Sequence, residues 1–308
     1  MGIVFGPVPS RRLGYSLGID VLPPADKMCT LNCVYCQVGH TKVQTIKRGI
    51  PLDSTLINQA IDEHLPMADI DVVTFSGSGE PTLHRYLGQF IERVKNRCDT
   101  PVAVLTNSTL IDKPDVRRDL ALADIVVPSL DAATQETFER INRPHRSLRV
   151  DSIIEGLIAF RDEFSGKFFL EIMLVKGFND DPSELLAIKK IVDRIRPDQV
   201  HLNTVTRPGA EPDARPLAQN ELERIAAIFG PDTFPIGTGP AVGRVADVRE
   251  LEAAVLDLVQ RRGVTLSDLV KSLGLERARA LEVLNNLAQQ NKVKKVVHGE
   301  VTYYREYY

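Results

Sequence analysis

The chain lacks long hydrophobic runs and carries little net charge. Its longest apolar segments have the length of single β-strands, so none of them is long enough to cross a bilayer. The beginning of the sequence also lacks the basic-then-apolar pattern of a signal peptide. We therefore expect a cytoplasmic protein with no membrane partner. With a net charge of −3, overall charge provides no argument for nucleic-acid binding.

Cysteine is scarce, with four residues in 308, but three of the four are clustered. Cys29, Cys33 and Cys36 follow the spacing C-x3-C-x2-C. Because cytosolic thiols stay reduced, this clustering favours metal binding or catalysis over disulfides. Three thiolates can hold three corners of a [4Fe–4S] cluster and leave one iron open for a small molecule. The fourth cysteine, Cys98, stands alone and is predicted to be structural.

Two other interpretations of the three cysteines remain open. Their positions are also i, i+4 and i+7, so the thiols could form a buried stripe on one helix face. Together with His40 they could instead form a closed Cys3His zinc site. Pro23 and Pro24 before the run and Gly39 after it favour a loop over a helix.

Length and periodicity predict a large α/β domain followed by a small one. Short β-branched runs alternate six times with amphipathic segments, which implies a parallel sheet with right-handed crossovers. The predicted strands are 16–21, 72–76, 102–106, 125–129, 168–175 and 200–205. The predicted helices are 54–64, 84–96, 114–122, 150–164, 182–195 and 219–229. Six units are fewer than the eight of a closed barrel, so we predict a partial (β/α)6 barrel over residues 1–230.

Polar residues follow the predicted strands, and in such barrels chemistry lies at the carboxyl ends of the strands. The glycine-rich segment from Ser76 to Glu80 ends the second strand, where small residues let the backbone approach a ligand. Several of the polar residues could instead cap the helices that follow, since Ser, Asn and Asp are preferred N-caps. Other rim candidates are Asn107, Ser129, Asp131, Glu171, Met173, Lys176, Asn203, Thr206 and Arg207. Near the start, Arg11 and Arg12 are candidates for pairing with a substrate phosphate or carboxylate.

The residues around the cysteines resemble the radical S-adenosylmethionine superfamily. That family carries C-x3-C-x-aromatic-C after the first barrel strand, and Tyr35 occupies the aromatic position here. The segments 5–20 and 76–83 resemble one branch of the family. That branch is related to the tRNA wyosine-forming enzymes and, more distantly, to the molybdenum-cofactor enzyme. A partial (β/α)6 barrel is also the fold that the resemblance implies.

The resemblance implies an enzyme with two cofactors, a [4Fe–4S] cluster and S-adenosylmethionine. One electron, from a flavodoxin- or ferredoxin-type donor, splits the sulfonium and yields a 5′-deoxyadenosyl radical, which abstracts hydrogen from a substrate that the sequence does not identify. By resemblance, Gly77 to Glu80 hold the amino group of S-adenosylmethionine, and other polar residues contact its carboxylate or ribose. The implied metal ligands are Cys29, Cys33 and Cys36, and the implied cofactor-binding residues are Tyr35, Gly77, Ser78, Gly79, Glu80, Asn107, Ser129, Asp131 and Glu171.

The tail, residues 249–308, is predicted to be a winged helix, reached through a linker at 231–248. Helical patterns at 251–259, 266–273 and 276–291 precede two short strands around His298 and Gly299, the layout of a helix-turn-helix with its wing. Ten Lys and Arg against eight Asp and Glu make the tail mildly basic. It could bind an RNA or protein substrate, or serve as a docking or dimerisation module. Its candidate nucleic-acid contacts are Arg277, Arg279, Lys292, Lys294, Lys295 and His298.

A second functional hypothesis is a non-catalytic regulator. In it the cysteines hold zinc or a sensing cluster beside a nucleic-acid-binding winged helix. A regulator needs no barrel, whereas a radical enzyme needs an enclosed site. The sixfold alternation of strands and helices therefore favours the enzyme.

Overall fold

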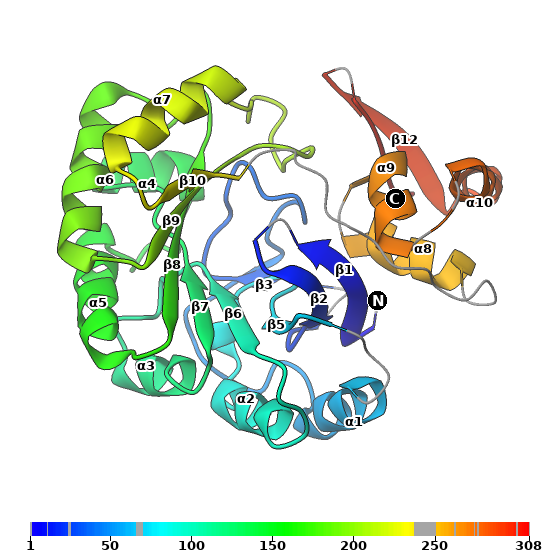
Figure 1. Ribbon diagram of the computed structural model, residues 1–308, viewed down its shortest axis with the longest axis horizontal. Helices are drawn as coiled ribbons and strands as arrows, with labels where there is room; N and C mark the ends of the chain where they lie inside the picture. Colours follow the sequence, from blue (N-terminus) through cyan, green and yellow to red (C-terminus); the bar gives the residue numbers. More distant parts are fainter. Residues whose placement is uncertain are drawn as a thin grey trace.

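A computed structural model places a large α/β unit beside a small C-terminal unit (Figure 1). The large unit contains the cysteine loop and the main sheet, and the small unit contains the tail helices and a hairpin. The structure describes residues 2–10, 12–23, 26–65, 70–236, 251–261, 263–273, 275, 277–299 and 301–307.

An eight-stranded sheet organises the large unit of the described chain. Its strands, in spatial order, are β1 (Val4–Ser10), β2 (Gly14–Ile19), β5 (Val72–Phe75), β6 (Val102–Thr106), β7 (Ile125–Pro128), β8 (Lys167–Leu174), β9 (Gln199–Thr204) and β10 (Thr233–Pro235). Only β1 pairs antiparallel, with β2, and every later pair is parallel. The predicted α/β class with a parallel sheet is therefore confirmed. The six predicted strands correspond to β2 and β5 to β9, and the sequence did not predict β1 and β10.

Helices follow the strands and lie along the outer side of the sheet (Figure 1). Asp53 caps α1 by accepting a hydrogen bond from Thr55 N, and Asp181 caps α6 with Pro182 in its first turn. These signals explain why α1 and α6 begin at the predicted residues, and at the start of α7 Glu221 accepts a hydrogen bond from Ala218 N at 2.8 Å. All three helices have the predicted bounds. The helices are α1 (Ser54–His64), the 3-10 helix η2 (Pro81–Leu83), α2 (Leu87–Lys95), α3 (Pro114–Leu120), α4 (Gln135–Asn142), α5 (Val150–Glu163), α6 (Pro182–Ile195) and α7 (Gln219–Phe229).

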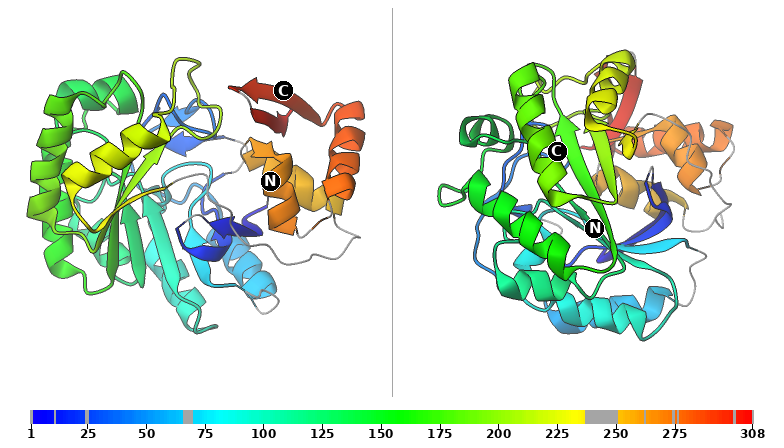
Figure 2. Two further views of the ribbon diagram at one scale, coloured as in Figure 1. Left: turned by 45° about the horizontal axis from the view of Figure 1, so that its top comes forward. Right: turned by 60° about the vertical axis from the view of Figure 1, so that its left-hand side comes forward.

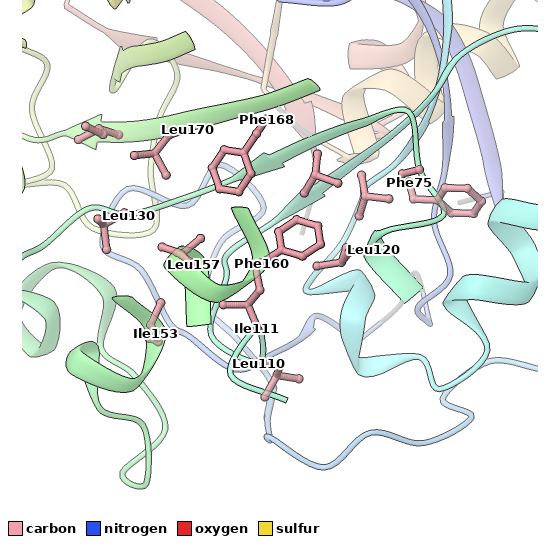
Figure 3. Close-up of a cluster of buried hydrophobic side chains, with 14 of the residues drawn as sticks. Phe75, Leu110, Ile111, Leu120, Leu130, Ile153, Leu157, Phe160, Phe168 and Leu170 are labelled. Carbon is pink, nitrogen blue, oxygen red and sulfur yellow. The ribbon is translucent and has the colours of Figure 1, made fainter. Parts of the chain in front are cut away.

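The core lies between the sheet and the helices that cover it (Figure 3). Phe160 of α5 is fully buried, and its ring centroid lies 5.0 Å from that of Phe164 and 6.0 Å from that of Phe168 on β8. Burying one such side chain stabilises the fold by about 1.5–3 kcal/mol. The packed core therefore fixes the strands whose carboxyl ends carry the polar rim.

The cysteine run lies in a long loop between β2 and α1. Two short strands, β3 (Met28–Cys29) and β4 (Val43–Gln44), pair within the loop, and residues 30–42 contain no helix. The alternative of a thiol stripe on a helix face is therefore wrong. Backbone hydrogen bonds hold the loop against the end of α4, from Asn32 N to Asn142 O and from Val34 N to Ile141 O, each at 3.0 Å.

The described residues of the C-terminal unit form three helices and a three-stranded sheet in the order β11–β13–β12. The winged-helix assignment of this unit stays a prediction. The predicted linker, 231–248, begins with β10, which extends the main sheet, and residues 237–248 lie outside the described residues. The elements of the tail are α8 (Leu251–Arg261), β11 (Val264–Thr265), α9 (Leu266–Leu273), α10 (Arg277–Gln289), β12 (Val293–His298) and β13 (Val301–Glu306).

The C-terminal unit packs beside β1, with its own apolar core (Figure 2). Val8 of β1 contacts that core, and the Tyr303 hydroxyl donates a hydrogen bond to Thr206 O. Arg305 Nη2 donates to Gln37 O at 2.6 Å, directly after the last clustered cysteine. The tail therefore contacts both the sheet end and the cysteine loop. No helix in the described ranges is long and apolar enough to span a lipid bilayer.

Candidate functional site

The three clustered cysteines line one cavity at the carboxyl end of the sheet. The cavity has a volume of about 410 Å³, which lies within the range of sites for small molecules and cofactors. All three thiols are free, with Cys29 buried and Cys33 and Cys36 partly buried. Cys98 does not line the cavity, and its Sγ lies 3.6 Å from Val94 O, just after the end of α2. The structure thus separates the clustered cysteines from the isolated one.

Hydrogen-bond donors and a lysine surround the thiols. Asn107 Nδ2 lies 3.4 Å from Cys29 Sγ, and Asn142 Nδ2 lies 3.3 Å from Cys33 Sγ. Burial raises the pKa of Cys29 to about 11, and it raises the pKa of Cys33 well above its usual range. Buried thiols of this kind become good ligands when a bound cation stabilises their thiolate form.

Lys27 supplies positive charge beside these thiols. Its Nζ donates a hydrogen bond to Gly39 O at 2.6 Å, across the cysteine loop. Burial lowers the pKa of Lys27, but the neighbouring Cys36, Cys29 and Cys33 outweigh burial and raise it. The lysine therefore stays charged and lies where several thiolates would collect negative charge.

The arrangement fits a multi-iron cluster better than a single zinc ion. Within the described residues, no three His, Cys, Asp or Glu side chains converge to hold one metal ion. His40, the fourth ligand of the zinc alternative, is exposed. A [4Fe–4S] cluster is larger than one ion, so its thiolate ligands surround it without converging on one point. Three free thiols on one cavity wall match that requirement.

The glycine-rich segment after β5 packs tightly against the cysteine loop. A Cβ on Gly79 would overlap the carbonyl oxygen of Met28, and a Cβ on Gly77 would overlap the carboxyl group of Asp20. Ser78 N donates to Asp20 Oδ2 at 2.8 Å. These glycines are therefore required by contacts within the protein itself, a reason that sequence analysis did not provide. Gly77, Ser78 and Gly79 nevertheless line the cavity with their backbone.

Ser78 provides an unsatisfied polar group at this wall. Its Oγ is buried and has no hydrogen-bond partner among the described residues. A buried hydroxyl without a partner costs free energy unless a ligand or water meets it. Ser78 thus suits a polar cofactor bound in the cavity.

Glu80 lines the cavity, but its carboxylate is bonded to neighbouring residues of the chain. Its buried carboxylate accepts hydrogen bonds from Thr82 N, Thr82 Oγ1, Thr106 Oγ1 and Asn107 N, at 2.7–3.0 Å. Burial raises the pKa of Glu80, although these donors oppose the shift. The expected direct contact of its side chain with the amino group of S-adenosylmethionine therefore competes with four existing hydrogen bonds. Its evident role is to join the ends of β5 and β6.

Asp131 likewise supports the cysteine loop. Its Oδ2 accepts hydrogen bonds from Tyr35 Oη at 2.5 Å and Asn142 Nδ2 at 2.7 Å, and its Oδ1 accepts one from Met173 N at 2.9 Å. Asp131 is buried and does not line the large cavity, whereas Tyr35 does. The structure therefore places Asp131 behind Tyr35, outside the lining of the large cavity. Burial raises the pKa of Asp131.

The remaining rim residues come together as expected from the strand order. Asn107, Ser129, Glu171, Met173, Asn203, Thr206 and Arg207 all line the cavity. Glu171 of β8 forms an ion pair with Arg12, which also lines the cavity. Arg11 lies outside the described residues, and Lys176 pairs with Glu221 on α7, away from the cavity lining.

Sequence reasoning missed Lys27, Asp20 and Asn142. Lys27 precedes the first cysteine by two residues, and a basic residue so close to the cysteine run could have identified it as a site residue. Asp20 directly follows β2, but the predicted strand 16–21 placed it inside the strand, so the rim rule did not select it. Asn142 ends α4, a helix that the sequence did not predict, and nothing near it in the sequence links it to the cysteines.

The Radical SAM superfamily model matches residues 27–187, which is more than half of the chain. A UPF0026 protein from Helicobacter pylori strain J99 is 32% identical over 315 residues, covering 98% of this chain and 97% of that protein. A Brachyspira hyodysenteriae protein named GTPase Obg is 36% identical over 307 residues, covering 97% of this chain. The chain spans only 45% of the length of that second relative.

More distant matches agree with the branch suggested by the sequence. A tRNA 4-demethylwyosine synthase from Oryza sativa is 24% identical over 214 residues, covering 62% of this chain and 31% of that protein. The crystal structure of SuiB from Streptococcus suis has a TM-score of 0.50 at 16% identity, covering 70% of this chain and 47% of that one. This likeness supports the fold alone. The family model and the relatives show that the chain belongs to the radical SAM superfamily of enzymes and, within it, to the UPF0026 proteins.

Proposed function

We propose that the chain is an enzyme that holds a [4Fe–4S] cluster through Cys29, Cys33 and Cys36 and binds S-adenosylmethionine in the same cavity. The observation that carries the proposal is that three free thiols and a lysine line one cavity, with amide groups of Asn107 and Asn142 within 3.4 Å of two of the thiols. When bound, the cluster supplies the electron that cleaves S-adenosylmethionine to a 5′-deoxyadenosyl radical, which abstracts hydrogen from the substrate.

The protein's own contribution is to position the cofactors and exclude water. The Tyr35–Asp131 hydrogen bond and the backbone bonds to α4 fix the cysteine loop. Gly77 to Gly79 offer backbone and the Ser78 hydroxyl to the amino end of S-adenosylmethionine, and Asn107, Ser129 and Glu171 line the wall available to its remaining polar groups. A cavity that encloses the ligand strengthens each of these polar contacts.

We describe the main sheet as a partial (β/α)6 barrel. Support comes from six parallel strands, β2 and β5 to β9, that follow chain order, with helices along one side (Figure 1). The cavity at the carboxyl ends of these strands is where such barrels carry their sites. This enclosure favours an enzyme over the regulator of the second hypothesis, because a sensing or structural metal needs no cavity for a second ligand.

We further propose that the substrate is an RNA held by the winged-helix tail, with a flavodoxin- or ferredoxin-type protein as electron donor. Four cations of the tail are exposed, with Arg277 and Arg279 on α10, Lys292 just before β12 and Lys295 on β12. Exposed cations on a hairpin and a neighbouring helix suit phosphate contacts. A relative that acts on tRNA adds support.

The test is anaerobic reconstitution followed by counting iron and sulfide. We expect about four of each per chain and loss of most of both in Cys29→Ala, Cys33→Ala and Cys36→Ala. Cys98→Ala is the matched control, because its thiol is free but lies outside the cavity. It should load the cluster like the unaltered chain.

Stoichiometric zinc without sulfide would contradict the cluster assignment. Equal loss of iron in Cys98→Ala and Cys33→Ala would contradict the choice of ligands. For the RNA proposal, the full chain is titrated with bulk tRNA at two salt concentrations, and affinity should fall steeply at the higher one. Absence of binding at low salt would instead favour a protein partner for the tail.

A further inference from the structure

Three basic side chains line the cavity, and two of them have evident partners among the described residues. Lys27 faces the thiols, and Arg12 pairs with Glu171. The third, Arg207, lies three residues after the end of β9. In the sheet, β9 is separated by three strands from β5, after which the glycine-rich segment lies.

Arg207 is nearly buried and poorly satisfied. Its side chain is 14% exposed, and its Nε is buried without a hydrogen-bond partner in the described structure. The carboxylate paired with it belongs to Asp268 of α9, whose Oδ1 lies 3.6 Å from Arg207 Nη2. That distance exceeds a hydrogen bond. A buried guanidinium with so few partners favours an anion that can approach it closely.

Asp268 is committed elsewhere, which explains the long distance. Its Oδ2 accepts a hydrogen bond from Thr265 N at 2.9 Å, at the start of α9. The carboxylate therefore caps its own helix and reaches Arg207 only with its second oxygen. A ligand free of that constraint can form the paired, two-oxygen contact that guanidinium groups favour.

We propose that Arg207 binds an anionic group of the substrate, a phosphate or a carboxylate, and that Asp268 of the tail is an internal competitor for this position. The inference rests on the proposed function, because the substrate must enter the cavity that also holds the cofactors. Both groups lie at the contact between the tail and the large unit, where Leu258 of α8 also lines the cavity. Substrate binding at Arg207 thereby replaces one contact that holds the tail over the cavity.

The carboxylate of S-adenosylmethionine is a second anionic group that could bind Arg207. The experiment therefore measures two affinities on the full-length, cluster-loaded protein. Binding of inorganic phosphate and of acetate is measured by equilibrium dialysis with saturating S-adenosylmethionine present. Binding of S-adenosylmethionine is measured separately by ultrafiltration.

Arg207→Gln should weaken binding of the better probe at least about tenfold, because it removes charge-assisted hydrogen bonds. Asp268→Asn should strengthen it about threefold, since the amide keeps a capping oxygen but loses the competing charge. Arg305→Gln is the matched control, because it removes an arginine of the same contact that does not itself line the cavity. It should leave the affinity unchanged. Iron and sulfide content reports that each variant is folded.

Three results would overturn the inference. The first is that neither phosphate nor acetate binds saturably. The second is that Arg207→Gln and Arg305→Gln have equal effects on probe binding. The third is that Arg207→Gln weakens S-adenosylmethionine about tenfold, which would assign the arginine to the cofactor. Failure of the proposed function is seen separately, as missing cluster or missing cleavage, whatever the probe affinities are.

Discussion

The two sides of the cavity satisfy their polar groups in different ways. On the side of β2, β5 and β6, both carboxylate oxygens of Asp20 and of Glu80 accept hydrogen bonds from neighbouring backbone or hydroxyl groups. On the side of β8 and β9, Glu171 and Arg207 are held by ion pairs with partners from distant parts of the chain. The first side is rigid before any ligand arrives, as a cofactor site requires. The second can exchange its partners for a substrate.

The tightest contact on the rigid side gives the largest expected effect. Gly79→Ala would place a Cβ against the Met28 carbonyl, so the glycine-rich segment or the cysteine loop must move. We expect a loss of about 3 kcal/mol in the free energy of unfolding, measured by chemical denaturation, and reduced cluster loading. Gly49→Ala is the control, since nothing lies within 4 Å of its added Cβ. Equal stability of the two variants would show that the glycine-rich segment and the cysteine loop can move apart without loss of stability.

The hydrogen bonds of Glu80 test the same rigidity without adding volume. In Glu80→Gln, an amide NH₂ group replaces one carboxylate oxygen. This NH₂ group cannot accept the hydrogen bonds that the oxygen accepted from donors such as Asn107 N. We expect a loss of about 2 kcal/mol in unfolding free energy. Glu163→Gln, which breaks an ion pair of a half-exposed carboxylate, should cost less than about 1 kcal/mol. Comparable losses in both variants would mean that the Glu80 network adds no stability.

On the side of β8 and β9, the pKa of His201 on β9 is sensitive to the positive charge of Arg12. Burial, together with that charge, lowers the pKa of His201 to about 4, so the unfolded chain binds a proton more readily. Stability should therefore fall as pH drops from 7 to 5, with this residue contributing about 1–2 kcal/mol. Denaturation of His201→Asn at both pH values checks this. An unchanged pH slope in the variant would remove His201 as the cause.

The smallest expected effect concerns the contact with the tail. Tyr303→Phe removes the hydroxyl that donates to Thr206 O but keeps the ring. We expect a loss of about 1 kcal/mol, seen as faster hydrogen exchange in β13 than in the core strand β6. Faster exchange in both strands equally would show that the tail and the sheet unfold together.

Sequence periodicity predicted the six central parallel strands because each is short, apolar and bounded by turn residues. It predicted α1, α6 and α7 to the residue, and Asp53 and Asp181 mark the starts of the first two. It missed β1, an edge strand that contains Pro7 and Pro9, since proline argues against a strand except at an edge.

Side-chain direction was the part that sequence could not provide. The spacing of the cysteines and the rim rule selected residues that do line one cavity. The same rule selected Asp131, whose carboxylate binds Tyr35 behind the cysteine loop. Asn142 reaches Cys33 across more than a hundred residues of chain, a contact that only tertiary packing creates.

The most direct test of the central claim is the fate of S-adenosylmethionine on the reduced, cluster-loaded protein. We predict release of 5′-deoxyadenosine and methionine in equal amounts, slowly even without substrate, and loss of both products in Cys33→Ala. Cys98→Ala should still release both. A fully loaded protein that binds S-adenosylmethionine and releases no 5′-deoxyadenosine after reduction would contradict the account.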